Sequence, residues 1–241
     1  GLGLSAATAP RFSAIILDLD GTLVDTLGDF EVALNRTLAD LDLPPLQASW
    51  IARQVGKGSE HLLRVSLTHS LAQAEPGLAN VCEARSPEAL LPTAWARYQH
   101  HYDTINGQYA TLFPGVPEGL ALLREAGLPL ACVTNKPLRF AQDLLAAKGL
   151  SGAFAQVFGG DSFARKKPDP LPLLKTCEAL GVAPAQTLMV GDSSNDAQAA
   201  HAAGCPVVLM TYGFNHGEPI KSVPALAWLD RLDTIGPFLH V

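Results

Sequence analysis

The sequence predicts an α/β fold in which a parallel-sheet core carries an inserted all-helical domain. From Pro117 to Met210, short apolar runs alternate with segments of helical spacing, the pattern of parallel strands joined by crossover helices. Between Asp25 and about Tyr109 the pattern is helical and contains no convincing strand, so this stretch forms a unit inserted after the first strand. The 241 residues suffice for one large domain or two small ones.

The first strand is expected at about 14–19, where the run Ala14-Ile15-Ile16-Leu17 is typical of a buried parallel strand. Helical segments follow at about 27–41, 46–54, 59–72 and 86–102. In the first of them, leucine and phenylalanine recur at steps of three and four residues until Pro44-Pro45 ends the pattern. Ser86-Pro87 predicts an N-cap followed by proline at the first helical position.

The remaining elements are expected in alternation. Helices are predicted at 117–126, 138–148, 170–180 and 195–203, each followed by a glycine, and strands at 128–133, 154–158, 187–190 and 207–210. The core then covers residues 11–26 and 106–241, and the insert covers 27–105. The two connections, near 25–28 and 105–110, would act as a hinge, for which Asn106-Gly107 supplies flexibility.

The composition excludes several classes of function. Charged residues make up 17% and hydrophobic residues 48%, as in globular proteins, and the net charge of -6 leaves no basic face for nucleic acid. The four cysteines lie far apart, which indicates reduced thiols and not a zinc site or a disulfide framework. No apolar run is long enough to cross a membrane, and the first residues lack signal-peptide features. We expect a cytoplasmic monomer or homodimer without nucleic-acid or membrane partners.

Two carboxylates stand where the first strand ends. Asp18 and Asp20 are one residue apart, and like charges at this spacing raise one another's pKa unless a cation lies between them. Ligands of open α/β sheets bind outside the carboxyl ends of the strands. The pair therefore indicates an active site with a metal, although Asp-Gly is also a common turn dipeptide.

Three further polar clusters follow predicted strands. They are Thr134-Asn135-Lys136, Lys166-Lys167-Pro168-Asp169-Pro170 and Gly191-Asp192-Ser193-Ser194-Asn195-Asp196. Each alone is typical of a loop or of a helix start. All of the clusters together, in this order and each at the carboxyl end of a strand, are a far more specific signal.

In this order the clusters resemble the motifs of the haloacid dehalogenase-like hydrolases, namely Asp-x-Asp-Gly-Thr, Thr-Asn, Lys-Pro-x-Pro and Gly-Asp-x-x-x-Asp. The resemblance runs from the first strand to the last and implies a Rossmann-like core with an α-helical cap at 27–105. Three segments resemble the bacterial phosphoglycolate phosphatases in particular. They are Val55-Gly56-Lys57-Gly58, Lys166-Lys167-Pro168 and the run from Thr211 to Glu218.

The chemistry of the acids agrees with this resemblance. A carboxylate such as Asp18 can attack phosphorus and so split hydrolysis into two easier steps through an aspartyl-phosphate. Asp20, two residues further along an extended chain, can protonate the leaving oxygen and later deprotonate water. Because the phosphate and these acids repel one another, Mg²⁺ is expected as cofactor. The resemblance implies that its ligands are Asp18, the backbone carbonyl of Asp20, and Asp192, with Asp196 as an orienting residue or a further ligand.

The resemblance also implies which residues hold the phosphate. Thr134 would donate a hydrogen bond to the phosphoryl oxygens, aided by the backbone of Asn135, and Lys167 would neutralise developing charge. Lys166 is expected to be a solvated neighbour. In the cap, Arg53 and Lys57 could contact a second anionic group of the substrate, although surface charges are an equal alternative.

The favoured function is Mg²⁺-dependent hydrolysis of 2-phosphoglycolate, a small phosphorylated metabolite of carbohydrate metabolism. A related phosphatase acting on sugar phosphates or nucleotides is the alternative. Asp20 argues against a dehalogenase, which lacks the second acid, and Phe30 stands where related hexose-phosphate mutases carry a cap histidine. Lys57 leaves a phosphonate hydrolase open, and a non-catalytic binding protein is disfavoured because no catalytic position is substituted. Gly56-Lys57-Gly58-Ser59 lacks the spacing of a Walker loop.

Overall fold

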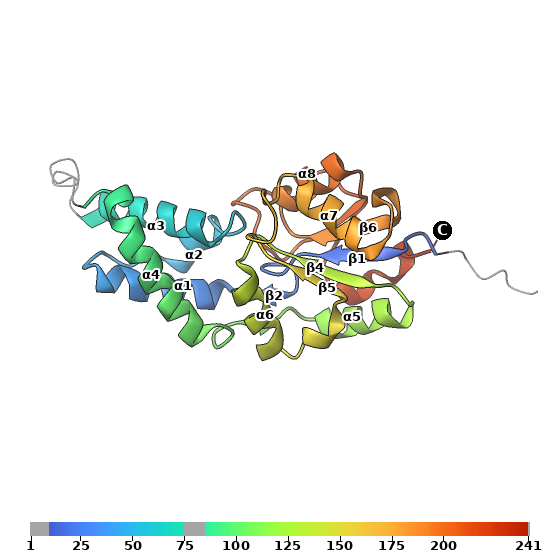
Figure 1. Cartoon of the computed structure of the whole chain (residues 1–241), viewed down its shortest axis with the longest axis horizontal. Helices are drawn as coiled ribbons and strands as arrows, with labels where there is room; N and C mark the ends of the chain where they lie inside the picture. Colours follow the sequence, from blue (N-terminus) through green and yellow to red (C-terminus); the bar gives the residue numbers. More distant parts are fainter. Residues whose placement is uncertain (1–9, 75–84, 241) are drawn as a thin grey trace, which may run out of the picture.

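A helical part and a sheet-containing part make up the molecule and lie at opposite ends of its long axis (Figure 1). The computed structural model describes residues 10–74 and 85–240. The chain enters the helical part between β2 and α1 and leaves it between α4 and β3. The helical part is therefore an insertion into the chain of the sheet part. We call it the cap and the sheet part the core.

A six-stranded parallel sheet forms the centre of the core. The strands run in the order β5-β4-β1-β6-β7-β8, with every neighbouring pair parallel. The fold class expected from the sequence is confirmed: an α/β, Rossmann-like core with an inserted α-helical cap. The strands are β1 Ala14–Leu17, β4 Leu130–Val133, β5 Gln156–Phe158, β6 Thr187–Gly191, β7 Val207–Met210 and β8 Ala227–Leu229.

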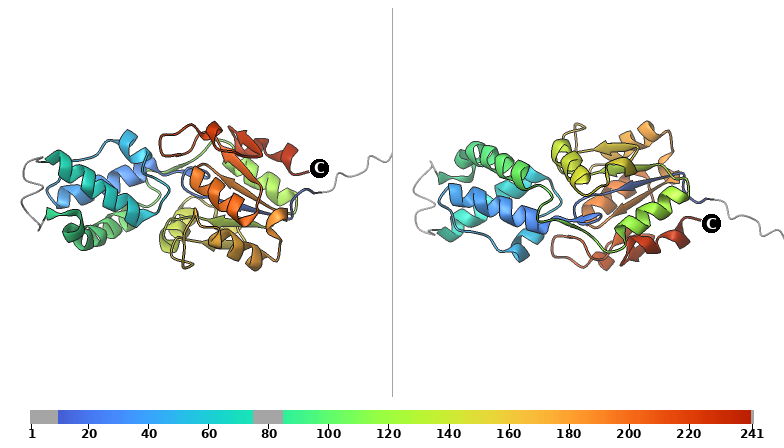
Figure 2. Two further views of the ribbon diagram at one scale, coloured as in Figure 1. Left: turned by 90° about the horizontal axis from the view of Figure 1, so that it is seen from above. Right: turned by 90° about the horizontal axis from the view of Figure 1, so that it is seen from below.

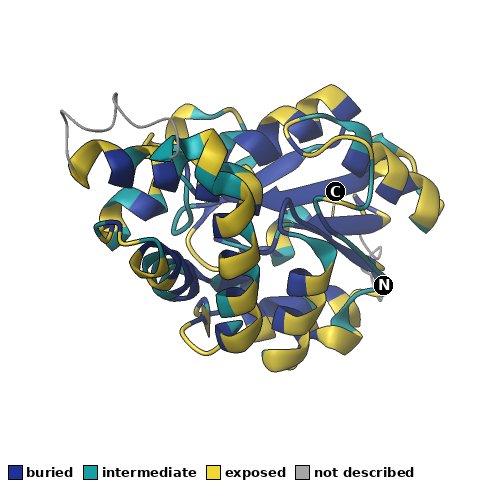
Figure 3. Ribbon diagram, turned by 60° about the vertical axis from the view of Figure 1, so that its left-hand side comes forward, coloured by how far each residue is buried: buried dark blue, intermediate teal, exposed yellow. Residues whose placement is uncertain are grey.

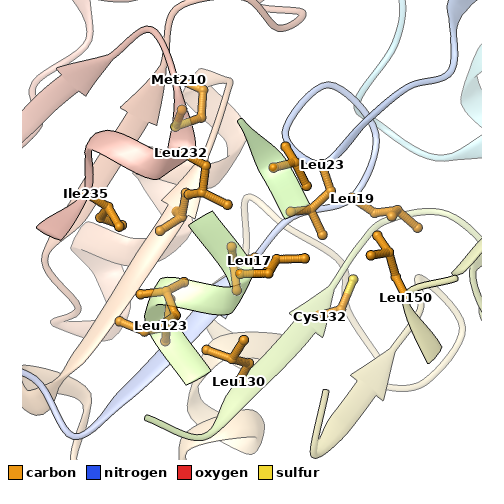
Figure 4. Close-up of a cluster of buried hydrophobic side chains, with 14 of the residues drawn as sticks. Leu17, Leu19, Leu23, Leu123, Leu130, Cys132, Leu150, Met210, Leu232 and Ile235 are labelled. Carbon is orange, nitrogen blue, oxygen red and sulfur yellow. The ribbon is translucent and has the colours of Figure 1, made fainter. Parts of the chain in front are cut away.

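Helices cover both faces of the sheet. Successive residues of a strand point to opposite faces, and those of β1 are apolar on both, so each face needs an apolar cover. Ile15 and Leu17 belong to an apolar cluster shared with α5, α6 and the C-terminal segment, part of which Figure 4 shows. Ile16 belongs to a second cluster shared with α7 and α8 on the other face. The helices are α5 Val116–Glu125, α6 Leu138–Ala147, α7 Leu171–Leu180 and α8 Ser194–Ala203.

The cap has an apolar cluster of its own, to which Phe140 of the core helix α6 also belongs. Buried and exposed residues alternate around its helices (Figure 3), as expected of helices that pack on one side only. The backbone N–H of Ala89 donates to Ser86 at 3.1 Å, which confirms the predicted N-cap. The cap helices are α1 Leu27–Asp40, α2 Ala48–Ala52, α3 Ser59–Ala74 and α4 Pro87–Ile105.

The two connections between cap and core lie side by side (Figure 2). They are joined by the short antiparallel pair β2 Val24–Asp25 and β3 Thr111–Leu112. The buried carboxylate of Asp29 accepts hydrogen bonds from the backbone N–H groups of Gly107 and Tyr109, both at 2.8 Å. Gly107 has a φ of 89°, a value that favours glycine. In this structure the glycine allows a bend, and Asp29 binds the backbone on both sides of it.

Some elements were absent from the sequence-based expectation. Strands β2 and β3 are two residues long, too short for any periodicity, and the three residues of β8 end an apolar run, 223–229, that contains no alternation of polar and apolar residues. Cys132, Cys177 and Cys205 are buried and free, as expected, whereas Cys82 lies outside the described residues. Among the described helices, none combines the length and the apolar character needed to cross a membrane.

Candidate active site

The core motifs meet at one edge of the sheet. Because β4, β1 and β6 are neighbours and parallel, the residues that follow them lie side by side. Asp18 and Asp20 follow β1, Thr134 follows β4, and Asp192 follows β6. Lys167, from the loop after β5, reaches the same point, since its Nζ lies 3.1 Å from Asp18 Oδ1. The sheet thus brings together residues that are up to 174 positions apart, from Asp18 to Asp192.

Asp18 lies at the centre of the site, with 13% of its side chain exposed. Its Oδ1 accepts a hydrogen bond from the backbone N–H of Leu19 at 2.7 Å and forms the ion pair with Lys167. Burial, followed by the nearby carboxylate of Asp196, raises the pKa of Asp18 to about 7, although Lys167 opposes the shift. The protein alone therefore does not fully balance the negative charge at this position.

Lys167 bridges two of the acids. Its Nζ lies 2.8 Å from Asp196 Oδ1, 3.1 Å from Asp18 Oδ1 and 2.8 Å from the carbonyl oxygen of Val133. Burial by itself lowers the pKa of Lys167, but the charges of Asp18 and Asp196 outweigh it and hold that pKa above its ordinary value. Lys167 is therefore a permanent positive charge beside the carboxylate of Asp18.

Asp192 is buried and held from both sides. Thr22 Oγ1 donates to its Oδ1 and the backbone N–H of Phe214 donates to its Oδ2, each at 2.8 Å. Gly21, with a φ of 84°, lets the chain pass beside this carboxylate, since a Cβ there would lie 2.1 Å from Asp192 Oδ2. Burial, and then Asp18 and Asp196, raise the pKa of Asp192 well above its ordinary value.

The three acids fit a divalent cation. Asp18, Asp192 and Asp196 each offer a carboxylate oxygen, and these atoms lie within 4.8 Å of one another. The pKa values of Asp18 and Asp192 are raised mainly by burial and neighbouring acids, so positive charge beyond that of Lys167 would favour their ionised forms, and a hard cation with oxygen ligands would supply it. The donor set and its excess negative charge are therefore suited to such an ion.

Asp196 orients its neighbours. Its Oδ1 pairs with Lys167, and its Oδ2 accepts from the backbone N–H groups of Asp192 at 2.9 Å and Ser193 at 3.3 Å. Burial alone would raise the pKa of Asp196, but Lys167 and the backbone N–H of Asp192 lower it below its ordinary value. Both oxygens of Asp196 thus accept from neighbouring groups of the protein, as a residue that orients the site would.

Asn135 connects the motifs to the cap. Its Nδ2 donates to the carbonyl oxygens of Gly56 at 2.9 Å and Lys167 at 2.8 Å, and its Oδ1 accepts from the backbone N–H of Lys167 at 3.0 Å. The neighbouring Thr134 accepts a hydrogen bond at Oγ1 from the backbone N–H of Lys136 at 3.0 Å, which leaves its hydroxyl hydrogen available to another acceptor.

Asp20 faces the cap. Its Oδ1 accepts a hydrogen bond from Thr26 Oγ1 at 2.7 Å and lies 2.9 Å from the Nζ of Lys136. The Lys136 ammonium also donates to the Tyr102 hydroxyl, and it lies over the ring faces of Phe30 and Tyr102, 4.5 and 4.6 Å from their centroids. The second acid of the first motif is therefore linked to aromatic side chains of α1 and α4.

A small cavity of about 30 Å³ separates the cap from the acids. This volume is well below the roughly 300–1,000 Å³ of typical small-molecule sites. The core contributes Asp18, Asp20, Thr134, Asn135 and Lys136 to its lining, and the cap contributes Phe30, Val55, Gly56, Gly58, Ser59 and Leu62.

The cap cations expected near the substrate lie outside the small cavity. Arg53 and Lys57 are exposed, and neither is among the residues that line the small cavity. Arg53 borders a hollow beside Gly217 and Glu218, and Lys57 borders another with Lys166, which is exposed as expected. Asp192 lines the same hollow as Arg53, and Lys167 lines the same hollow as Lys57, so both cations border the site from outside the small cavity.

Three residues of the site had no role in the sequence-based interpretation. Thr22 belongs to the first motif, and Lys136 directly follows Thr134-Asn135, so both stood inside recognised clusters. Thr26 had no such signal. Their contacts come from strands and helices that fold back on the motif, which spacing alone does not report.

The sequence matches the family model of the haloacid dehalogenase-like hydrolases over residues 15–210. It is 41% identical over 220 residues to a phosphoglycolate phosphatase of Thiobacillus denitrificans, covering 89% of this chain and 92% of that one. It is 42% identical over 228 residues to a plasmid-encoded phosphoglycolate phosphatase of Cupriavidus necator, covering 94% and 93%.

The fold has solved relatives as well. The crystal structure of a predicted phosphoglycolate phosphatase from Haemophilus somnus superimposes with a TM-score of 0.87 at 33% identity, covering 95% of this chain and 98% of that one. The agreement covers the cap as well as the core, since nearly the whole of both chains is superimposed.

Proposed function

Because the chain belongs to the haloacid dehalogenase-like hydrolases and is a phosphoric monoester hydrolase, we propose that it converts 2-phosphoglycolate into glycolate and phosphate. The observation that carries the reaction is the meeting of Asp18 and Asp20 with Lys167 and Asp192 at the carboxyl edge of the sheet. The observation that supports the substrate is the similarity to two phosphoglycolate phosphatases over about nine tenths of the chain.

Asp18 is the nucleophile of this proposal. Its carboxylate attacks phosphorus, the bond from phosphorus to the ester oxygen breaks, and a phosphoryl group remains on Asp18. Asp20 gives its proton to the departing oxygen, so glycolate leaves with a hydroxyl group. Asp20, now ionised, takes a proton from water, whose oxygen attacks the phosphoryl group and releases phosphate. Both acids line the same cavity, as these steps require.

The remaining residues bind and orient the phosphoryl group. Lys167, 3.1 Å from Asp18, lies where charge develops during transfer, and the free hydroxyl hydrogen of Thr134 is available to a phosphoryl oxygen. The backbone of Asn135 is proposed as a further contact. Mg²⁺, held by Asp18, the backbone carbonyl of Asp20 and Asp192, would supply positive charge that lowers the repulsion between substrate and nucleophile.

The small cavity between cap and acids favours a compact leaving group, because a large sugar or nucleoside would hold the cap further from the acids. Residues 27–105 are proposed as the moving cap over a core formed by 11–26 and 106–241. A phosphatase for sugar phosphates or nucleotides is the alternative. A cytoplasmic location and a monomer or homodimer are also proposed. The free thiols of the described cysteines suit a reducing compartment.

A metabolite panel tests the proposal. With Mg²⁺ present, kcat/KM for 2-phosphoglycolate should exceed the values for sugar phosphates and nucleotides. Asp18→Asn should abolish turnover and leave the far-UV circular dichroism unchanged. A higher kcat/KM for a sugar phosphate or nucleotide than for 2-phosphoglycolate would favour the alternative. Turnover at the wild-type rate by Asp18→Asn would refute the assignment of the nucleophile.

A further inference from the structure

We propose that Lys136 binds the carboxylate of the leaving group and so determines specificity for a substrate that carries this charge. This inference rests on the proposed hydrolysis of 2-phosphoglycolate and extends it to a residue that recognises the part of the substrate beyond the phosphate. It is carried by the position of Lys136, by its partners, and by the charges that line the cavity.

The Lys136 side chain is buried, with 2% of its surface exposed, yet it borders the cavity between cap and acids. Its described polar partners are Asp20 Oδ1 at 2.9 Å and the Tyr102 hydroxyl. An ammonium group has three hydrogens to donate. Two described partners leave one donor for a ligand in the cavity.

The position of Nζ suits a charge close to the ester oxygen. A general acid must lie about 2.6–3.2 Å from the oxygen that it protonates, so the ester oxygen is placed next to Asp20. Because Lys136 Nζ is 2.9 Å from Asp20 Oδ1, it lies within about 6 Å of that oxygen. In 2-phosphoglycolate a single methylene separates the ester oxygen from the carboxylate, whose oxygens lie about 3 Å away. A substrate can therefore place these oxygens within hydrogen-bond reach of Nζ.

The charges around the cavity also favour Lys136 as the partner of an anionic leaving group. Among the described residues that line it, Asp18 and Asp20 are acidic and Lys136 is the only lysine or arginine. Gly58 and Ser59, where α3 begins, also line it, and the N-terminus of this 16-residue helix adds partial positive charge. Arg53 and Lys57 border other hollows. An anionic leaving group therefore has Lys136 as its full positive partner here.

The aromatic side chains keep this ammonium in place. Phe30 and Tyr102 present their ring faces to Nζ, so the charge cannot turn away toward solvent. With water largely excluded, a hydrogen bond between ammonium and carboxylate is stronger than at an exposed site. A neutral leaving group of the same size cannot form it, and discrimination between the two follows.

The test compares kcat/KM for 2-phosphoglycolate with kcat/KM for ethyl phosphate, in which a methyl group replaces the carboxylate. Lys136→Met keeps an unbranched side chain that suits the rings of Phe30 and Tyr102 but removes the charge. We expect the preference for 2-phosphoglycolate over ethyl phosphate to fall roughly 10- to 100-fold, the range for a hydrogen bond to a charged group. Lys175→Met, an exposed lysine of α7, is the matched control and should keep the wild-type preference.

The possible outcomes separate this inference from the proposed function. A wild-type protein without preference for 2-phosphoglycolate would refute the substrate and this assignment together. A clear wild-type preference that Lys136→Met leaves unchanged would overturn the assignment alone and show that Lys136 acts only through Asp20. Selective loss in Arg53→Gln or Lys57→Met would overturn it in favour of those cations.

Two further variants keep the test decisive. Lys136→Gln serves for the same comparison if Lys136→Met does not fold, since its amide retains a polar contact for Tyr102. Binding can also be measured without turnover, by calorimetry in the Asp18→Asn background. There, adding Lys136→Gln should weaken 2-phosphoglycolate binding more than ethyl phosphate binding. Equal weakening of both ligands would contradict the inference.

Discussion

At the scale of single residues, the site is defined by an imbalance of charge. Two lysines, Lys136 and Lys167, lie beside Asp18, Asp20 and Asp196. The pKa of Asp18 nevertheless stays near 7, because burial and Asp196 outweigh Lys167. A group whose neighbours leave it short of positive charge in this way is a candidate for cation binding and for catalysis.

Binding of Mg²⁺ should release protons at acidic pH. The cation binds the ionised carboxylate, so below the Asp18 pKa of about 7 it must displace a proton. Affinity should rise with pH up to about 7 and change less above it as far as Asp18 is concerned. Calorimetry at pH 6 and pH 8, in buffers of different ionisation enthalpy, measures the protons released. Equal release at both values would contradict the prediction.

The same shift has a consequence for stability. Without the cation, Asp18 holds its proton more tightly in the folded chain than in the unfolded chain, where its pKa is 3.8. Its contribution to stability is therefore greatest below 3.8 and falls as pH rises toward about 7. Mg²⁺ favours the ionised form and should raise Tm more at pH 8 than at pH 5. A larger increase at pH 5 would reverse the sign and refute the assignment.

Asp20→Asn should slow both halves of the reaction. The amide cannot donate a proton to the leaving oxygen or accept one from water, and loss of a general acid–base group costs roughly a hundredfold to ten-thousandfold in kcat. The burst and the steady-state rate report the two steps separately. An aryl phosphate, whose leaving group needs little protonation, should lose less in the burst. Unchanged rates in both phases would rule out this role for Asp20.

At the scale of elements, the ends of strands and helices position the site. The turn after β6 is held by Asp196, which accepts from the backbone of Asp192 and Ser193 and closes a capping box at the start of α8. At the other end of the site, Asp29 in the first turn of α1 accepts two backbone N–H groups from the returning connection. Asp196 thus holds a strand-to-helix turn of the core, and Asp29 holds the connection that returns from the cap.

Asp29→Ala should destabilise the protein. It leaves the buried N–H group of Gly107 and the partly buried one of Tyr109 without their acceptor, at a cost of about 2–4 kcal/mol in free energy of unfolding. Asp29→Asn keeps one acceptor oxygen and should cost less. Urea unfolding followed by fluorescence measures both. An Asp29→Ala variant as stable as the wild type would show that these hydrogen bonds contribute little.

At the scale of the whole molecule, the cap and the core meet over the acids. The carbonyl oxygen of Gly56 in the cap accepts from Asn135 at 2.9 Å and from Asn195 at 3.2 Å, both in the core. Phe140 of α6 packs into the apolar cluster of the cap, with its ring centroid 4.7 Å from that of Tyr102. Closure is thus held by a polar contact beside the cavity and an apolar one near the hinge.

Asn195→Ala should shift the cap toward open conformations. Loss of one hydrogen bond, worth about 0.5–1.5 kcal/mol, would change the ratio of closed to open molecules roughly two- to twelvefold. Limited proteolysis near residues 53–58 should become faster, and KM should rise. Gln198→Ala, an exposed position on the same helix, is the control. Proteolysis at the wild-type rate in Asn195→Ala would show that this contact does not hold the cap.

Most of the fold followed from local patterns. The alternation of apolar runs and helical spacing predicted five of the parallel strands and the cap helices, because burial on a sheet or on one helix face imposes a period that a short window reveals. Strand β8 and the pair β2–β3 were not predicted, since pairing with a neighbouring strand stabilises them more than their own sequence does.

The sequence by itself determined the order of the elements and the set of motif residues, because strand ends and turn residues are local properties of the chain. Only the tertiary structure decided how the cap completes the site. It placed Lys136 between Asp20 and the rings of Phe30 and Tyr102, and it left Arg53 and Lys57 outside the cavity. The reason is physical. These contacts join segments far apart in the chain, and their free energy depends on burial and charge in the assembled molecule, which no local pattern records.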